Sequence, residues 1–136
     1  MPLDASAETL LSRVFGFKTL RDGQVPIVDA VLSGADVLAI LPTGGGKSLC
    51  YQLPALVKGG LTVVVSPLIA LMRDQVSALT DLGIPAGALN SMNDAQESRR
   101  IWDEIAEGRL RLLYVSPERL ALNGTADRLA RHGVSL

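Results

Sequence analysis

The feature that most constrains this chain is a run of glycines ending in lysine and serine, Thr43-Gly44-Gly45-Gly46-Lys47-Ser48. An apolar stretch, Val37 to Leu41, precedes the run, and a segment able to start a helix, Leu49 to Val57, follows it. Glycines permit a tight turn that points several N–H groups into one concavity, and a helix N-terminus adds unpaired donors and a positive dipole end. A glycine-rich surface turn could arise by chance, but the full order of strand, turn and helix predicts a phosphate-binding loop.

The polar residues of this loop have distinct expected roles. Lys47 would reach the β- and γ-phosphates of a nucleotide, and the Ser48 hydroxyl would ligate Mg²⁺, so these two are the catalytic candidates. The other nucleotide contacts expected in the loop are Pro42, Thr43, Gly44, Gly45 and Gly46. The strict pattern G-x-x-x-x-G-K-[ST] fails at one place, because Leu41 stands where its first glycine would be.

Length and composition indicate an aliphatic α/β protein. The 136 residues make one domain at most, and with 48% hydrophobic but only 4% aromatic residues the interior must be filled by Leu, Val, Ile and Ala. No apolar run approaches the roughly 20 residues that span a bilayer, and the N-terminus has no basic region typical of a secretory signal, so we expect a cytoplasmic protein. The single cysteine, Cys50, excludes an internal disulfide and a cysteine-based zinc site and is expected to be a buried small residue. A net charge of −1 shows no large basic field for nucleic acid.

Helix and strand signals alternate along the chain. Helical spacing predicts helices over 5–14, 23–32, 49–57, 68–82 and 94–107 and another starting at 117. A β-branched run predicts a strand over 61–65, and other apolar runs predict strands over 37–41, 86–89 and 110–115. Pro54 is expected to kink or end its helix because it cannot donate to the Cys50 carbonyl. This alternation predicts a parallel sheet covered by helices on both faces.

Three further segments acquire meaning beside the phosphate loop: Phe15 to Gln24, Val65 to Val76 and Leu113 to Leu120. Together with Leu41 to Gln52 they resemble four motifs, in the same order, of the N-terminal part of RecQ-family ATP-dependent DNA helicases of superfamily 2. The resemblance covers the chain from about Phe15 onward, and these helicases also relax the first loop glycine. It implies a RecA-like P-loop NTPase fold, ATP and Mg²⁺ as cofactors, single-stranded or branched DNA as partner, 3′-to-5′ movement, and a role in DNA repair and recombination, nucleoid-associated if the source is bacterial.

The first of these motifs suits a purine base. Phe17 offers an apolar face for stacking, and Gln24 offers a carbonyl and an amide on one side chain, which match an exocyclic amine and a ring nitrogen. The residues alone leave open that Phe15 and Phe17 are core residues and that Gln24 is merely exposed. The resemblance assigns Phe17, Arg21 and Gln24 to adenine recognition and nucleotide sensing. Leu20 departs from the family, in which an aromatic residue is common at that position.

Two Ser-Pro pairs, Ser66-Pro67 and Ser116-Pro117, each follow a predicted strand and are expected to open a helix, with serine as the cap. Capped helix N-termini on the rim formed by strand carboxyl ends can hold nucleic-acid phosphates without net positive charge. Plain helix capping would produce the same pattern, and the resemblance favours DNA contact. The expected DNA-contacting residues are Ser66, Pro67, Leu68, Asn90, Ser91, Ser116, Pro117, Glu118 and Arg119. Several arginines are instead expected to be solvated or paired with nearby acids: Arg73, Arg99, Arg100, Arg109 and Arg111.

Phosphoryl transfer needs a carboxylate for Mg²⁺, a residue that orients water, and usually an arginine finger. In the resembled helicases an Asp-Glu-x-His strand supplies the first two, but the adjacent acids here, Asp103 and Glu104, fall inside a predicted helix. Val134 to Leu136 has the pattern of the strand that would carry such a motif. We therefore expect an N-terminal helicase fragment that lacks the second RecA-like domain: residues 1–34 form a helical segment with the adenine motif, and residues 35–136 form a partial ATP-binding domain. In that domain Val37 to Ile40 would lack strands that come later in the chain.

Two other classes of protein stay open. A different P-loop enzyme, such as a nucleotide kinase, would share the phosphate loop but leave the segments Phe17 to Gln24 and Leu113 to Leu120 unexplained. A catalytically inactive module that binds nucleotide or nucleic acid would share every motif and differ only in turnover. For these 136 residues taken alone, the inactive module is the expected chemistry, whereas the parent protein is expected to hydrolyse ATP.

Overall fold

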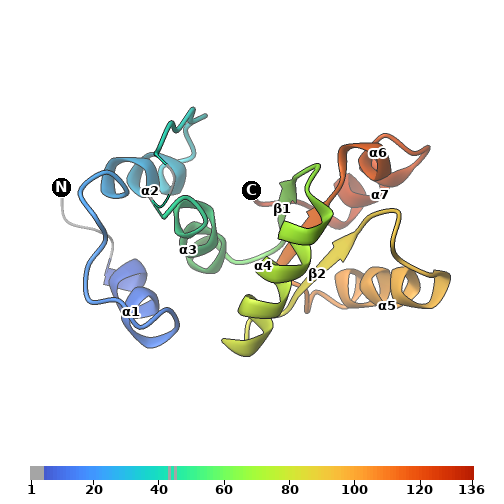
Figure 1. Ribbon diagram of the computed structural model, residues 1–136, viewed down its shortest axis with the longest axis horizontal. Coiled ribbons are helices and arrows are strands. Elements are labelled where there is room, and N and C mark those ends of the chain that lie inside the picture. Colours follow the sequence, from blue (N-terminus) through green and yellow to red (C-terminus); the bar gives the residue numbers. More distant parts are fainter. Residues whose placement is uncertain (1–4, 43, 45) are drawn as a thin grey trace. The chain divides into compact units, whose positions relative to one another are not determined.

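The computed structural model describes residues 5–42, 44 and 46–136, so the expected contacts at Thr43 and Gly45 lie outside the described residues. The chain divides into two compact units, Met1–Lys58 and Gly59–Leu136, and each is described by itself (Figure 1). The boundary expected after residue 34 stays a prediction about the complete domain.

The first unit is built from three helices, α1 (Ala5–Arg13), α2 (Val25–Leu32) and α3 (Leu49–Lys58). Both α1 and α2 pack against α3. Their contact is made by aliphatic side chains at helical spacing, and Leu11, Val28 and Leu53 are completely buried there. This small apolar core positions the segment before α2 and the turn before α3 beside each other, and these carry the predicted nucleotide contacts.

Helix α3 continues past Pro54 to Lys58, so of the two outcomes expected at this proline, a kink or an end, the end does not occur. Proline removes one intrahelical hydrogen bond, at the Cys50 carbonyl, and the remaining turns persist when packing holds them. Here Leu53, Pro54 and Ala55 are all buried, so tertiary contact compensates for the missing donor.

The strand expected at Val37 to Leu41 is absent from the structure. Residues 35–42 form neither helix nor strand, and Leu38 and Ile40 are 89% and 87% exposed. A strand exists only through hydrogen bonds to a neighbouring strand, and the described residues of the first unit contain helices and no strand that could pair with it. The assignment of this segment as a buried strand is therefore wrong for this chain. That it lacks strands which come later in the chain stays a prediction.

The second unit contains a parallel sheet of the kind predicted. Strands β1 (Thr62–Val65), β2 (Ala86–Leu89) and β3 (Leu112–Val115) lie in the order β1-β3-β2. The helices that connect and follow them are α4 (Ile69–Asp81), α5 (Ala95–Ala106), α6 (Pro117–Leu120) and α7 (Thr125–His132), so the region expected to begin one helix at residue 117 holds two. The predicted α/β fold class is confirmed. No helix in the described part of the chain has the length and apolarity needed to cross a membrane.

Both faces of the sheet are covered, as the four successive buried residues of β3 require. On one face Leu113 and Val115 pack in a cluster with Trp102 of α5 and Leu129 of α7. On the other face Tyr114 is 2% exposed, and α4 packs on the neighbouring strand β2, in front of the sheet in Figure 1. Burial on both sides explains why β3 reads as a continuous apolar run rather than as an alternating strand.

The outer edge of β1 is joined by the last residues of the chain. The Ser135 N–H donates to the Leu61 carbonyl at 2.8 Å, and the Val63 N–H donates to the Leu136 carbonyl at 2.8 Å. These bonds place the segment that was expected to open a further strand alongside β1. Only a short stretch is paired, and it carries no strand assignment of its own.

Candidate functional site

The phosphate-loop candidates lie where the first turn of α3 begins. The Cys50 N–H donates to the Lys47 carbonyl at 3.1 Å, and the Gln52 N–H donates to the Ser48 carbonyl at 2.9 Å. Lys47 and Ser48 therefore occupy the helix N-terminus, where unpaired N–H groups and the positive dipole end favour an anion. The Lys47 side chain is exposed, so its ammonium is accessible to a bound phosphate.

Gln24 holds the glycine loop from the side of α2. Its Nε2 donates to the Gly46 carbonyl at 3.0 Å, and its Oε1 accepts the Arg21 N–H at 2.9 Å. Gln24 is only 3% exposed. It lies directly before α2, and its own carbonyl accepts the Val28 N–H. The structure thus brings together two predicted motifs that are more than 20 residues apart in the chain.

The close approach of Gln24 explains why position 46 is a glycine. Gly46 has φ +75°, and a Cβ added there would lie 2.2 Å from the Gln24 Nε2, well inside van der Waals contact. Gly44 also has a positive φ, of +79°, but a Cβ there would meet nothing within 4 Å. The Arg21 guanidinium donates to the Gly44 carbonyl, so both described glycines of the loop receive a hydrogen bond from the Arg21–Gln24 motif.

Cys50 is buried, as expected, and contributes a contact that sequence reasoning missed. Its Sγ lies 3.7 Å from the Gly46 carbonyl, the same oxygen that Gln24 bonds. Burial raises the pKa of the Cys50 thiol, which keeps it protonated and able to donate. The spacing of four residues from Gly46 to Cys50 across a helix start is the signal that could have indicated this contact.

The two phenylalanines of the adenine motif have different environments. Phe15 packs against the core of the first unit, whereas Phe17 is 54% exposed. Gly16, which lies between them, has φ +74°, a backbone conformation that glycine adopts readily. An exposed aromatic ring beside the Arg21–Gln24 motif fits the stacking role expected for Phe17, and Phe15 is the core residue of the pair.

In the second unit the predicted nucleic-acid contacts gather at the carboxyl ends of the strands. Val65, Leu89 and Val115 are aligned in register as the last residues of the three parallel strands. The residues that follow them, Ser66, Asn90 and Ser116, therefore lie together at the carboxyl ends. Two backbone hydrogen bonds fix this alignment: the Ser66 N–H donates to Val115, and the Ser116 N–H donates to Leu89. The carboxyl ends of the strands are where open parallel sheets bind their ligands.

The two Ser-Pro pairs at this edge differ. Ser116 caps α6 as predicted, because its hydroxyl accepts the Arg119 N–H at 3.2 Å and Pro117 is the first helical residue. Ser66 does not cap α4, so that expectation is wrong. Its hydroxyl accepts the Leu68 N–H at 3.3 Å in a local turn, Leu68 is extended, and α4 begins only at Ile69. Such turns by serine compete with helix initiation, and the N-terminus of α4 is left without a side-chain cap.

The side chain of Asn90 is largely committed to its own loop. Its Oδ1 accepts the Met92 N–H at 2.8 Å, and its Nδ2 points at the Met72 sulfur at 3.6 Å. Asn90 is 8% exposed, whereas Ser91 is exposed and Met92 is 69% exposed. Asn90 thus shapes the loop that presents the next two residues. Met92 was not among the predicted contacts, because an isolated methionine carries no pattern.

The remaining predicted contacts after β3 are divided between exposed and internal positions. Pro117 and Glu118 are exposed. Arg119 is half-buried, and its Nη1 donates to the Thr125 hydroxyl at 2.7 Å, which ties α6 to the start of α7. The guanidinium of Arg119 therefore has a structural partner within the second unit.

Comparison with known proteins gives one family and a consistent set of relatives. The family model described as DEAD/DEAH box helicase matches residues 21–133. The "ATP-dependent DNA helicase RecQ" of Pasteurella multocida is 49% identical over 120 residues, which are 88% of this chain and 19% of that protein. The protein of the same name from Synechocystis is 46% identical over 85% of this chain and 24% of its own length. The "Probable ATP-dependent DNA helicase RecS" of Bacillus subtilis is 45% identical over 93% of this chain and 25% of its own length. The resemblance drawn from the motifs is confirmed, and the chain spans a quarter or less of these relatives.

Proposed function

The chain belongs to the DEAD/DEAH box helicase family, and on that basis we propose that it forms the first part of the motor domain of an ATP-dependent DNA helicase. In this proposal the loop before α3 binds ATP with Mg²⁺, and the carboxyl-end loops of the sheet bind DNA. The observation that carries the nucleotide half is the contact of Gln24 and Arg21 with Gly46 and Gly44. It joins a candidate base-binding motif to a candidate phosphate-binding loop in one place.

The chemistry at this place suits ATP. The α3 N-terminus and Lys47 supply positive potential for the phosphates, and the Ser48 hydroxyl is the residue that would hold Mg²⁺. Phe17 would stack on the base. The contacts of Gln24 with Gly46 and Arg21 use one N–H and one acceptor site of its amide, so the second N–H and the second lone pair would bond the edge of adenine.

The DNA half of the proposal rests on the aligned loops after β1, β2 and β3. The uncapped N-terminus of α4 offers backbone N–H groups at the carboxyl ends of the strands. The apolar residues Leu68 and Met92 in these loops are 59% and 69% exposed. Backbone donors can hold phosphates and apolar side chains can contact bases, so a strongly basic surface is not needed. Single-stranded or branched DNA is the proposed ligand.

The activity of the whole protein is also a proposal, since the chain spans 19–25% of the relatives described above. A second RecA-like domain would supply an arginine finger and the rest of the DNA track, and movement would run 3′ to 5′, as the relatedness to RecQ helicases suggests. In such a protein the described units would contribute nucleotide binding and one part of the DNA path.

Lys47→Ala tests the nucleotide site. The substitution removes the charge directed at the β- and γ-phosphates, so the affinity for ATP should fall by about 1.5–3 kcal/mol, as for a charged hydrogen bond. Fluorescence titration of the 136-residue chain with a labelled ATP analogue and Mg²⁺ measures this. Arg13→Ala, which removes one exposed positive charge from α1, is the matched control and should leave the affinity unchanged. Equal binding by the Lys47 variant and the original chain would contradict the assignment of the loop.

Gln24→Ala tests the base-binding motif. The loss of its donor and acceptor should lower the preference for ATP over GTP by about 1 kcal/mol, because only the base differs between the two nucleotides. Phe17→Ala is the companion variant: stacking does not distinguish purines, so it should weaken ATP and GTP alike. Competition titrations with both nucleotides give the two ratios. An unchanged ratio for Gln24→Ala would show that this residue serves only to hold Gly46.

A further inference from the structure

The sheet has an open edge at β2. In the described sheet β2 pairs with β3 alone. The carbonyls of Pro85 and Leu89 accept hydrogen bonds from residues on the β3 side, Arg111 and Ser116 among them. Because successive residues of a strand point their backbone groups to opposite sides, Ala86 and Ala88 direct their N–H and C=O groups outward, away from β3. This edge is a ready template for one more strand.

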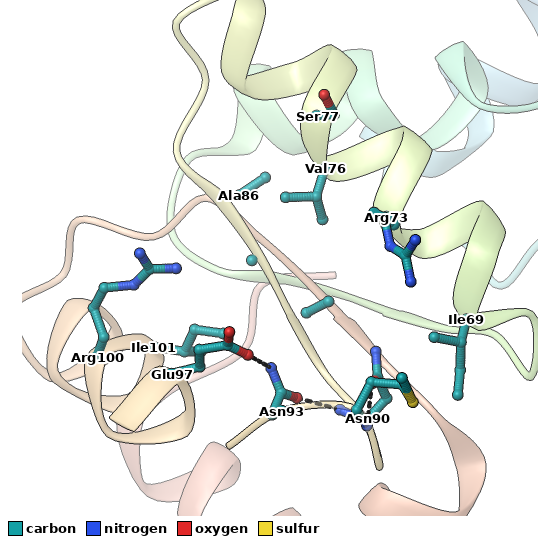
Figure 2. A pocket seen from close by; sticks show the side chains of 13 residues that line it. Ile69, Arg73, Val76, Ser77, Ala86, Asn90, Asn93, Glu97, Arg100 and Ile101 are labelled. Carbon is teal, nitrogen blue, oxygen red and sulfur yellow. Dashed lines mark hydrogen bonds between the residues drawn. The ribbon is translucent and has the colours of Figure 1, made fainter. Parts of the chain in front are cut away.

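A groove follows this edge between α4 and α5. It consists of two adjoining pockets of about 480 and 520 Å³, which share Val76, Ala86, Arg100 and Ile101. Figure 2 shows the first pocket, with β2 passing between the side chains of α4 and those of α5. Of β2, only Ala86, Gly87 and Ala88 line the two pockets, so no large side chain of the strand keeps a peptide backbone away from it.

Two arginines without partners flank the groove. Arg73 enters it from α4, and Arg100 enters it from α5 on the other side of β2 (Figure 2). Both are exposed, and neither makes a hydrogen bond or ion pair with any residue in the described ranges. Among nearby acids, Glu97 accepts a hydrogen bond from Asn93, and Arg109 with Glu107 is the one ion pair found among the described residues.

We propose that this groove binds an extended acidic segment of a partner protein, which adds to β2 as a further strand. Backbone hydrogen bonds to Ala86 and Ala88 would align the segment. Its alternate side chains would face α4 and α5, where carboxylates would meet Arg73 and Arg100. The first pocket shares Asn90 and Met92 with the proposed DNA-binding loops. A nucleic acid nevertheless fits the length of the groove less well, since Glu97 and Glu104 also line it and would repel a continuous phosphate backbone. A peptide, in contrast, can carry carboxylates opposite the two arginines and uncharged side chains opposite the two glutamates.

The test uses the 136-residue chain and three fluorescein-labelled peptides of roughly eight residues, a usual strand length. The first repeats Asp-Asp-Val-Val, which places carboxylates on both faces of a strand. The second replaces each Asp by Lys, and the third repeats the first with every backbone amide N-methylated. Fluorescence anisotropy measures binding to the original chain and to Arg73→Glu, Arg100→Glu and Arg99→Glu. Arg99 is the matched control because it is exposed on α5 next to Arg100 and lines neither pocket.

The acidic peptide should bind more tightly than the lysine peptide, and binding should fall by at least about 10-fold in Arg73→Glu and in Arg100→Glu. Arg99→Glu should change it by less than about 2-fold, and N-methylation should abolish it, because a methylated amide cannot pair with the strand edge. Equal loss in Arg99→Glu, or full binding of the N-methylated peptide, would overturn the proposal. So would displacement of the peptide by single-stranded DNA with the same variant pattern, or sedimentation showing that a second copy of the chain occupies the groove.

Discussion

The purified 136-residue chain should hydrolyse ATP at least about 10³-fold more slowly than a full-length RecQ helicase and should not be stimulated by single-stranded DNA, because an arginine finger alone contributes 10³–10⁵ to turnover. Binding through the loop of Gly44 to Ser48 would stabilise the bound nucleotide, but acceleration requires interactions reserved for the transition state. The chain would then behave as a nucleotide-binding module without turnover.

The arrangement of the carboxylates is the structural reason for this expectation. The adjacent acids Asp103 and Glu104 lie on α5, in the second unit, and not at the end of a strand. Within the described ranges no cluster of three or more His, Cys, Asp and Glu side chains could hold a metal ion. In the proposed site Mg²⁺ is held by the Ser48 hydroxyl and the phosphates, and neither Asp103 nor Glu104 stands at a strand end, where the carboxylate for metal and water is expected.

A coupled phosphate-release assay with and without single-stranded DNA, run beside the full-length helicase, measures the difference. The Lys47→Ala variant serves as the control for contaminating ATPases, since true activity of this site must depend on Lys47. Robust hydrolysis by the original chain that disappears in Lys47→Ala would contradict the inactive-module interpretation while supporting the site itself.

Gly46→Ala should lower the free energy of unfolding of the first unit and the affinity for ATP by about 2–4 kcal/mol each. Roughly 1–2 kcal/mol is expected from a non-glycine residue at a positive φ, and the remainder from displacing the Gln24 amide, whose Nε2 would lie 2.2 Å from the new Cβ. Chemical denaturation followed by far-UV circular dichroism gives the stability, and titration with a labelled ATP analogue gives the affinity.

Gly44→Ala separates the two contributions. Its φ of +79° matches that of Gly46, but its new Cβ would meet nothing within 4 Å. It should therefore show the conformational effect alone, about 1–2 kcal/mol. If Gly44→Ala and Gly46→Ala had equal effects, the contact between Gln24 and the loop would not contribute to stability or binding.

Much of the fold was predictable because its elements have local causes. The strand at residues 86–89 and the helix predicted over 94–107 lie where the sequence places them, since a short apolar run and helical spacing are both visible within a few residues. The start of α4 and the end of α3 were less predictable. The start of α4 depends on whether the Ser66 hydroxyl bonds into a turn, and the end of α3 depends on whether packing supports the helix past Pro54. Neighbouring residues in the sequence decide neither.

The candidate site shows the same division. The glycine loop and the Phe17 to Gln24 motif could each be found, because glycine, lysine and glutamine at fixed spacing have few structural alternatives. Their joining through Gln24 and Gly46 could not, since 22 residues separate the two and only packing of α2 on α3 brings them together. Arg73 and Arg100 were expected to be solvated or ion-paired, and the structure shows them exposed. Which of the two outcomes holds was not decided by spacing, since helical spacing places Glu104 near Arg100 but does not make the pair form.

The sequence by itself determined the family, the alternation of helix and strand, and the residues able to bind a nucleotide, because these follow from residue types and short-range spacing. Only the tertiary structure decided that Val37 to Leu41 is not a strand here, that Ser66, Asn90 and Ser116 align at one edge, and that β2 has an open side. The physical reason is that a sheet is made of hydrogen bonds between distant segments. A strand, an edge or a rim exists only when its partner is in place.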